Sequence, residues 1–144
     1  MSLNAFNSGC NVLAYDRRGR KMAMCCAWAM QYSYSDLLML LGSQSDTGNC
    51  LGVGDMVGVS SLSKGQGNIA LQLGTGHSLT SDKFSGIQYT NDHGVILIDG
   101  AKVRMRCEVT RIDCLDADHL VYLRVDGYED DPTKEFLGYG ELGL

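Results

Sequence analysis

The sequence predicts a mainly β protein, a small barrel of six or seven strands with one or two short helices. Glycine supplies 18 of the 144 residues and proline only one, which is typical of many short strands joined by tight turns. Residues 103–110 alternate between apolar and polar side chains, so one face of this segment is expected on a core and the other in water. Hydrophobic residues make up 44% of the chain and charged residues 20%, as in a packed globular domain.

The N-terminal part of the chain predicts a hairpin. Residues 10–16 form an apolar stretch typical of a strand, and the basic turn at residues 17–20 contains Gly19, which favours a tight turn. The second run, residues 22–30, is apolar or small at almost every position. Periodicity therefore leaves open whether this run is a buried strand or a buried helix.

The central part predicts two strands, two loops and a helix. Strands are expected at residues 36–42 and 54–62, and the polar stretch 43–49 between them is expected to be a functional loop. Ser63 lies three residues before Gln66, the spacing of a capping box, which predicts a short helix from Lys64 to about Leu73. The glycine-containing segment 74–86 is too long for a tight turn, and we interpret it either as a site-forming loop or as a plain surface loop.

The C-terminal part predicts further strands. Residues 95–98 are apolar, and residues 103–125 predict a long hairpin whose turn lies at residues 114–118. A mass of 15.6 kDa fits one domain. We expect residues 10–144 to form this domain. Residues 1–9 are expected to be an N-terminal extension, with Met1-Ser2-Leu3 typical of a cloning-vector remnant.

Charge and hydropathy exclude several functional classes. Seventeen acidic and twelve basic residues give a net charge of −5, so nucleic acid is not an expected partner. The apolar runs fall short of the roughly 18 residues that a membrane span needs, and no membrane association is expected. Residues 1–9 lack the basic and apolar regions of a signal peptide, so we expect a cytoplasmic protein.

Six cysteines occur in this chain without a secretion signal, and they are expected to be buried thiols rather than disulfides. They and His119 lack the paired Cys-x-x-Cys spacing of a zinc site, so no metal is expected. Cys107 falls on the apolar face of the alternating segment and is predicted to lie in the core. The six are Cys10, Cys25, Cys26, Cys50, Cys107 and Cys114.

Six short motifs follow one another along the chain, at residues 11–28, 35–38, 42–47, 57–62, 81–86 and 117–125. Their order and spacing resemble the flavin reductase-like family of FMN-binding split barrels over residues 10–144. Three departures stand out. Met22 replaces an asparagine of the first motif, Cys25 replaces a threonine, and Ala117 replaces the glycine of a "GDH" element.

The resemblance implies a Greek-key split barrel that binds FMN, or FAD, without a covalent bond. It implies a homodimer with the flavin at or near the subunit interface, and NAD(P)H as the electron donor. The activity expected is NAD(P)H-dependent flavin reduction, a hydride transfer from nicotinamide to flavin. Two alternatives stay open, an FMN-binding electron carrier that a partner protein reduces, and a barrel that has lost flavin.

A flavin phosphate in a protein of net charge −5 needs local donors. The polar loop supplies candidates in Ser43, Ser45, Thr47 and Gly48. The alternative is that these hydroxyls only cap a short helix near Thr47. Lys83 is the favoured cation because it lies, with Phe84, in a "DKF" element that resembles the family's.

The flavin ring needs a flat apolar slot with backbone donors near its polar edge. Small and soft side chains that let a backbone approach such a ring occur at Met24, Cys25, Cys26 and Ala27, although a buried barrel strand accounts for the same residues. Trp28 is expected either to stack near the flavin or to lie in the core.

His119 stands in the "GDH"-like element, whose histidine in the family's reductases lies near the nicotinamide side of the flavin. Hydride transfer needs alignment more than proton abstraction, so His119 is predicted to position the nicotinamide and flavin.

Overall fold

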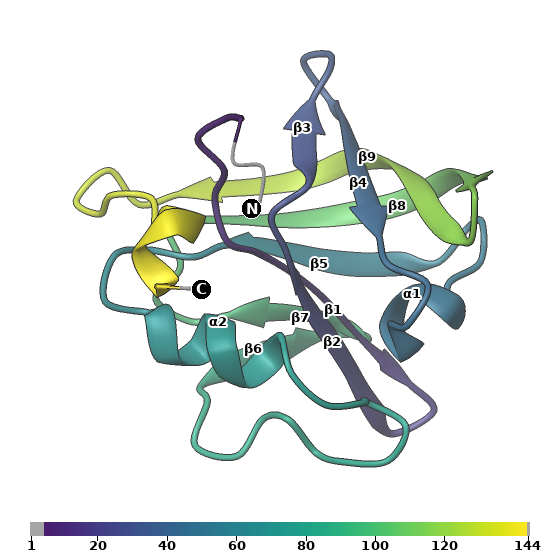
Figure 1. Ribbon diagram of the computed structural model, residues 1–144, viewed down its shortest axis with the longest axis horizontal. Coiled ribbons are helices and arrows are strands. Elements are labelled where there is room, and N and C mark those ends of the chain that lie inside the picture. The colour runs from purple at the N-terminus through teal and green to yellow at the C-terminus, as the bar shows by residue number, and fades with distance from the viewer. Residues whose placement is uncertain (1–4, 144) are drawn as a thin grey trace.

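Nine antiparallel strands form one continuous sheet that curls around a core in the computed structural model, which describes residues 5–143 (Figure 1). The strands lie in the order β3-β4-β9-β8-β5-β1-β7-β6, and β2 pairs with β1 outside this path. Their bounds are β1 Asn11–Arg17, β2 Arg20–Cys26, β3 Ala29–Gln31, β4 Asp36–Leu41, β5 Met56–Ser61, β6 Tyr89–Asp92, β7 Val95–Ile98, β8 Val103–Leu115 and β9 Asp118–Asp130.

The helices are short. They are α1 Asp46–Asn49, α2 Gly67–Leu73 and a 3₁₀ turn at Tyr139–Leu142. The mainly β prediction with one or two short helices is confirmed, but the strands number nine in place of six or seven. None of the helices in residues 5–143 is long and apolar enough to span a membrane. The cloning remnant expected at residues 1–3 lies outside the described residues.

The β1–β2 hairpin forms as the sequence predicts. Arg18 and Gly19 occupy its two-residue turn with φ of 54° and 85°, the positive values that a tight hairpin turn requires. The Asp16 carboxylate accepts a hydrogen bond from the Gly19 N–H at 2.7 Å. The ambiguous run 22–30 is a strand as far as Cys26 and then starts the short edge strand β3.

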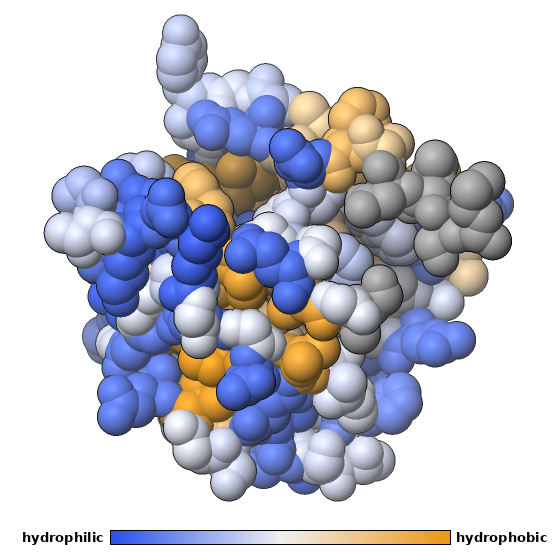
Figure 2. Space-filling view, turned by 60° about the vertical axis from the view of Figure 1, so that its left-hand side comes forward, coloured by the Kyte–Doolittle hydropathy of each residue, from blue (hydrophilic) through white to orange (hydrophobic). Residues whose placement is uncertain are grey.

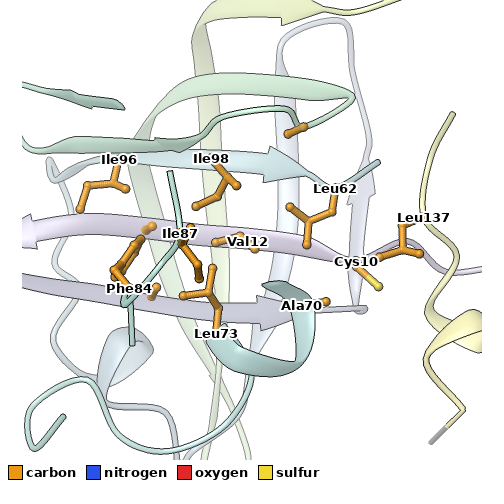
Figure 3. Packing of buried hydrophobic residues seen from close by; sticks show 13 residues of the cluster. Cys10, Val12, Leu62, Ala70, Leu73, Phe84, Ile87, Ile96, Ile98 and Leu137 are labelled. Atoms are coloured by element: carbon orange, nitrogen blue, oxygen red, sulfur yellow. The ribbon is translucent and has the colours of Figure 1, made fainter. Parts of the chain in front are cut away.

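Alternate residues of β1 face two different cores, because side chains along a strand point to opposite faces. Val12 and Ala14 pack with α2, β7 and residues 84–87 in one cluster, which Figure 3 shows from close by. Leu13 and Tyr15 pack in a second cluster with residues of β4, β5, β8 and β9. The apolar runs of β1 and β2 are therefore continuous because both faces of these strands are buried. This explains why hydrophobic periodicity did not distinguish a strand from a helix at residues 22–30.

Gly58 in β5 marks the closest approach of two strands. A Cβ on this residue would lie 1.9 Å from the carbonyl oxygen of Ile96 in β7. Glycine is thus required by the packing of β7 across β5.

Two predictions for the remaining elements have different outcomes. The long hairpin is confirmed, with β8 and β9 joined through Asp116, whose φ is 55°. The helix predicted from Lys64 was placed too early, because α2 starts at Gly67. The Gln66 side chain does accept a hydrogen bond from the Ser63 N–H, at 2.9 Å, but Gly65 with φ of 95° makes this segment a turn before the helix.

Candidate functional site

The outer edge of β2 is the structural basis of the candidate site. Within residues 5–143, β2 pairs only with β1. Successive pairs of this ladder, such as Leu13 with Met24 and Val12 with Cys25, are alternately hydrogen-bonded and non-hydrogen-bonded. The Cys10 carbonyl accepts the Leu62 N–H, so even-numbered residues of β1 bond toward β5. The backbone groups of Ala23 and Cys25 consequently point away from β1, toward the open edge.

Residues 74–88, the loop between α2 and β6, cover part of this edge. Ser78 Oγ accepts a hydrogen bond from the Ala23 N–H at 3.1 Å and lies 3.2 Å from the Ala23 carbonyl oxygen. Lys83 Nζ donates to the same carbonyl at 3.0 Å. Lys21 forms an ion pair with Asp82 at 3.4 Å. The segment left open between a site loop and a surface loop is therefore packed against β2 through a buried polar network.

The next edge residue, Cys25, is not covered in the same way. Between residues 5 and 143, no hydrogen bond engages its backbone N–H or C=O. Gly74 lies beside it, since a Cβ on Gly74 would be 3.5 Å from the Cys25 Cβ. The N–H donor and the C=O acceptor of Cys25 are thus both available at one point of the edge. A planar heterocycle whose rim carries alternating acceptors and donors can form hydrogen bonds with both.

The polar loop lies next to this open edge. Ser45 Oγ contacts the Met24 sulfur at 3.2 Å, which joins two residues predicted to bind the flavin. Ser45 also accepts a hydrogen bond from the Gly48 N–H and caps α1, so the capping interpretation holds for this hydroxyl. Gly48 is buried against Leu41, because a Cβ added at Gly48 would lie 3.0 Å from the Cβ of Leu41.

The other hydroxyls of the loop differ in exposure. Thr47 is buried, with Oγ1 at 3.3 Å from Ser78 Oγ, so its hydroxyl belongs to the network behind the edge. Ser43 is exposed, and its N–H donates to the Asp118 carboxylate at 2.9 Å. The Ser43 hydroxyl is the member of the set that faces solvent.

Lys83 and Phe84 lie inside the fold. Lys83 Nζ donates to the carbonyls of Ala23 and Leu73, and its side chain is 9% exposed. Burial lowers the pKa of Lys83, partly offset by the negative charge of Asp46. Phe84 is 3% exposed and packs edge-on against Tyr89 at 5.0 Å. The phosphate contact expected of Lys83 stays a prediction, and these two bonds give the ammonium a structural role.

The remaining slot residues point in different directions. Cys26 faces the second core, where its thiol contacts the carbonyls of Trp28 and Leu40 at 3.2 and 3.3 Å, and burial raises the pKa of this thiol to about 11. Ala27 is half-buried. Trp28 is 64% exposed, so of its two interpretations, core and ring stacking, the core one is wrong.

His119 lies at the start of β9, opposite Leu41 and Cys114. Its Nδ1 is buried and, among residues 5–143, has no hydrogen-bond partner. The neighbouring Asp118 holds the Ser43 N–H. The structure therefore places His119 opposite Leu41, just before the polar loop, and next to Asp118, which bonds that loop.

A separate groove was not predicted from the sequence. It has a volume of about 810 Å³ and crosses β3, β4, β5 and β8 between the N-terminal and C-terminal segments. Its border includes exposed apolar side chains at Phe6, Met30, Tyr128 and Phe136. Figure 2 turns the side that carries the C-terminus forward and shows apolar surface among hydrophilic side chains. None of the predicted flavin-binding residues lines this groove.

The cysteines and acidic residues form no metal centre in the described part of the chain, where no three His, Cys, Asp or Glu side chains could share an ion. All six cysteines are free thiols. Cys107 is buried as predicted, with 0% exposure.

The family of the chain is shown by its sequence. The flavin reductase like domain matches residues 3–141, so the chain belongs to this family of oxidoreductase domains. No curated protein sequence matches the chain.

Solved structures share the fold. The NADH:FAD oxidoreductase of Streptomyces globisporus has a TM-score of 0.83 and 19% identity, over 91% of this chain and 80% of that one. An FMN-binding protein of Thermus thermophilus, solved with 1-cyclohex-2-enone, has a TM-score of 0.80 and 16% identity, over 92% and 79%. The styrene monooxygenase flavin reductase of Pseudomonas putida S12 has a TM-score of 0.76 and 19% identity, over 88% and 82%. The split barrel predicted from the motifs is confirmed.

Proposed function

We propose that this protein binds FMN at the open edge of β2 and reduces it with NAD(P)H. The observation that carries the proposal is the backbone N–H and C=O of Cys25, which have no partner among residues 5–143. Gly74 lies beside Cys25, and Ser45 of the polar loop contacts the neighbouring Met24. Reductases that act on flavin occur among the structural neighbours.

The residues present fit the cofactor. The Cys25 backbone can bond the polar edge of the ring, and Gly74 lies beside Cys25, where an added Cβ would also lie 2.9 Å from the Ala70 carbonyl oxygen. Ser43 presents a free hydroxyl for the phosphate, and Ser45 is held in place by Met24 and Gly48. The flavin supplies the two-electron chemistry when it is bound, and the chain orients it and excludes water.

His119 is proposed as a positioning residue for the nicotinamide. Its unpaired Nδ1 is a polar atom whose burial is costly without a partner, and its backbone lies beside the loop that would hold the flavin phosphate. A bound dinucleotide that satisfied this nitrogen would be held in a fixed orientation.

The test is an absorption spectrum of the purified protein after addition of FMN and desalting, followed by NADH or NADPH under argon. A retained flavin band that bleaches with a nicotinamide supports the reductase and identifies its donor. A retained band that bleaches only with a protein donor supports the alternative, an electron carrier reduced by a partner. Loss of the band on desalting, together with no NAD(P)H oxidation when FMN is in excess, rejects both.

The homodimer implied by the resemblance is proposed to use the apolar groove. Phe6 is 84% exposed, Tyr128 65% and Phe136 54%, and a contiguous set of such side chains around one groove is typical of an interface. Light scattering after size-exclusion chromatography tests this, with twice the monomer mass expected. A Tyr128→Asp variant is expected to shift the mass toward the monomer, and a monomeric wild type contradicts the proposal.

A further inference from the structure

Two of the six thiols lie side by side behind the proposed flavin site. Cys10 comes directly before β1, and Cys25 is paired with Val12 in β2, so the two are diagonal neighbours across the hairpin. Both belong to the cluster under α2, Cys10 as a buried member with 1% exposure and Cys25 packed against it. Figure 3 shows Cys10 at the end of this cluster, beside Leu137 and Ala70.

The other cysteines are oriented elsewhere. Cys26 faces the opposite core, as do Cys107 and the half-buried Cys50. Cys114 is exposed near the end of β8. Side chains on one face of adjacent strands interact with diagonal neighbours, so Cys10 and Cys25 are the pair that the fold presents for cross-linking. Cys10 precedes the β1–β2 ladder, so a small movement of its backbone breaks no hydrogen bond to β2, although its carbonyl also accepts the Leu62 N–H at 2.9 Å on the other side.

We propose that Cys10 and Cys25 form a dithiol–disulfide couple that exchanges two electrons with the flavin bound at the edge of β2. This inference rests on the proposed function. In the oxidising direction the two S–H bonds break and one S–S bond forms between the sulfur atoms. Both electrons and both protons pass to the oxidised flavin, which becomes the reduced flavin. The reverse reaction returns them, so the protein can store one pair of electrons.

The surroundings of the thiols protect them from dissolved oxidants. Burial, together with the neighbouring thiols of Cys10 and Cys26, raises the pKa of Cys25 to about 12, and burial raises the pKa of Cys10. The thiolate is the form that attacks a dissolved oxidant, so both residues react slowly with such oxidants at neutral pH. The backbone of Cys25 is a proposed contact of the flavin ring, which brings an oxidant next to a thiol that solvent reaches poorly.

The test counts thiols. Protein reduced and desalted under argon receives one equivalent of oxidised FMN, is denatured in acid and is alkylated with N-ethylmaleimide. Mass spectrometry is expected to show two of the six thiols protected, in a Cys10–Cys25 cross-linked peptide, with bleaching of the flavin band. Cys114→Ser is the matched control and keeps the cross-link, whereas Cys25→Ser and Cys10→Ser lose it. Circular dichroism shows whether each variant is folded.

The possible outcomes distinguish failure of the thiol couple from failure of the proposed flavin-binding function. Quenching of FMN fluorescence in the same samples measures binding. Bound FMN with all six thiols alkylated overturns the thiol couple and leaves the proposed function standing. Absence of binding overturns both.

Discussion

Lys83 Nζ lies 3.0 Å from the carbonyl oxygen of Ala23, and this bond joins the loop after α2 to the edge of β2. The same ammonium donates to the Leu73 carbonyl at the end of α2, at 3.1 Å. One side chain thus fixes three elements around the proposed flavin site. The sequence predicts this lysine as a phosphate ligand. In the structure its ammonium joins α2 to β2.

Lys83→Ala is expected to lower the free energy of unfolding by about 1–3 kcal/mol, because the buried carbonyls of Leu73 and Ala23 both lose the lysine donor and only Ala23 keeps another contact, with Ser78 Oγ. Urea unfolding measures the change. Lys64→Ala is the matched control, since Lys64 is exposed and forms only a surface ion pair with Glu135 at 3.5 Å, which contributes little. If Lys83→Ala keeps its stability but binds FMN more weakly, the phosphate role predicted from the sequence is correct.

Gly58→Ala is expected to cost more than about 3 kcal/mol or to prevent folding, since its Cβ would overlap the Ile96 carbonyl at 1.9 Å. Gly42→Ala is the control, because nothing lies within 4 Å of a Cβ there. Thermal unfolding of both variants gives the comparison. Equal melting temperatures would show that β7 can move away from β5.

The strands were predictable where one face meets a core and the other meets water. The alternation of residues 103–110 predicted β8, and the glycine in the basic turn predicted the β1–β2 hairpin. The run 22–30 was ambiguous because β2 is buried on both faces, so its residues carry no period. The late start of α2 follows from Gly65, whose positive φ interrupts the predicted helix.

The candidate site was predictable only in part. The sequence indicated the polar loop and the strand beside it, and the contact between Ser45 and Met24 brings these together. It did not indicate that Thr47 and Lys83 would turn inward, since their partners are Ser78 and two backbone carbonyls. The groove was missed because its residues come from both ends of the chain. Trp28, Met30, Tyr32 and Tyr34 are all exposed, but only Met30 among them lines the groove, so their alternation did not indicate it.

Alkaline pH is expected to destabilise the protein through its buried thiols. Burial raises the pKa of Cys25 and Cys107 to about 12, and that of Cys26 to about 11, from an ordinary value of 9.0. Between pH 9 and 11 the unfolded chain releases these three protons, while the folded chain keeps those of Cys25 and Cys107 and begins to release that of Cys26 near pH 11. Burial also raises the pKa of Tyr15 from 10.0, which adds to the effect at the upper end of this range. The free energy of unfolding therefore falls as the pH rises, by at most about 1.4 kcal/mol per pH unit for each of these groups.

Cys107→Ala tests this pH dependence. The variant is expected to show a shallower slope in urea unfolding between pH 9 and 11, by at most about 1.4 kcal/mol per pH unit. Val109→Ala is the control, because Val109 lies in the same core and its truncation lowers stability at every pH without removing a titrating group. A slope that is the same in wild type and Cys107→Ala contradicts the assignment.

Ser43→Ala is expected to weaken FMN binding by about 1.5–3 kcal/mol, because it removes a hydroxyl donor from a charged phosphate. Ser43 is exposed and its backbone N–H already bonds Asp118, so the loop keeps its position and the free energy of unfolding is expected to change by less than about 0.5 kcal/mol. FMN fluorescence quenching measures the affinity. Thr133→Ala removes a similarly exposed hydroxyl, which bonds Asp131 on the segment after β9 and lies in none of the elements of the proposed site, and it is expected to bind FMN like the wild type. Equal affinities for wild type and Ser43→Ala would place the phosphate elsewhere, because no other hydroxyl of the Ser43, Ser45 and Thr47 set is both exposed and free of a bond within the fold.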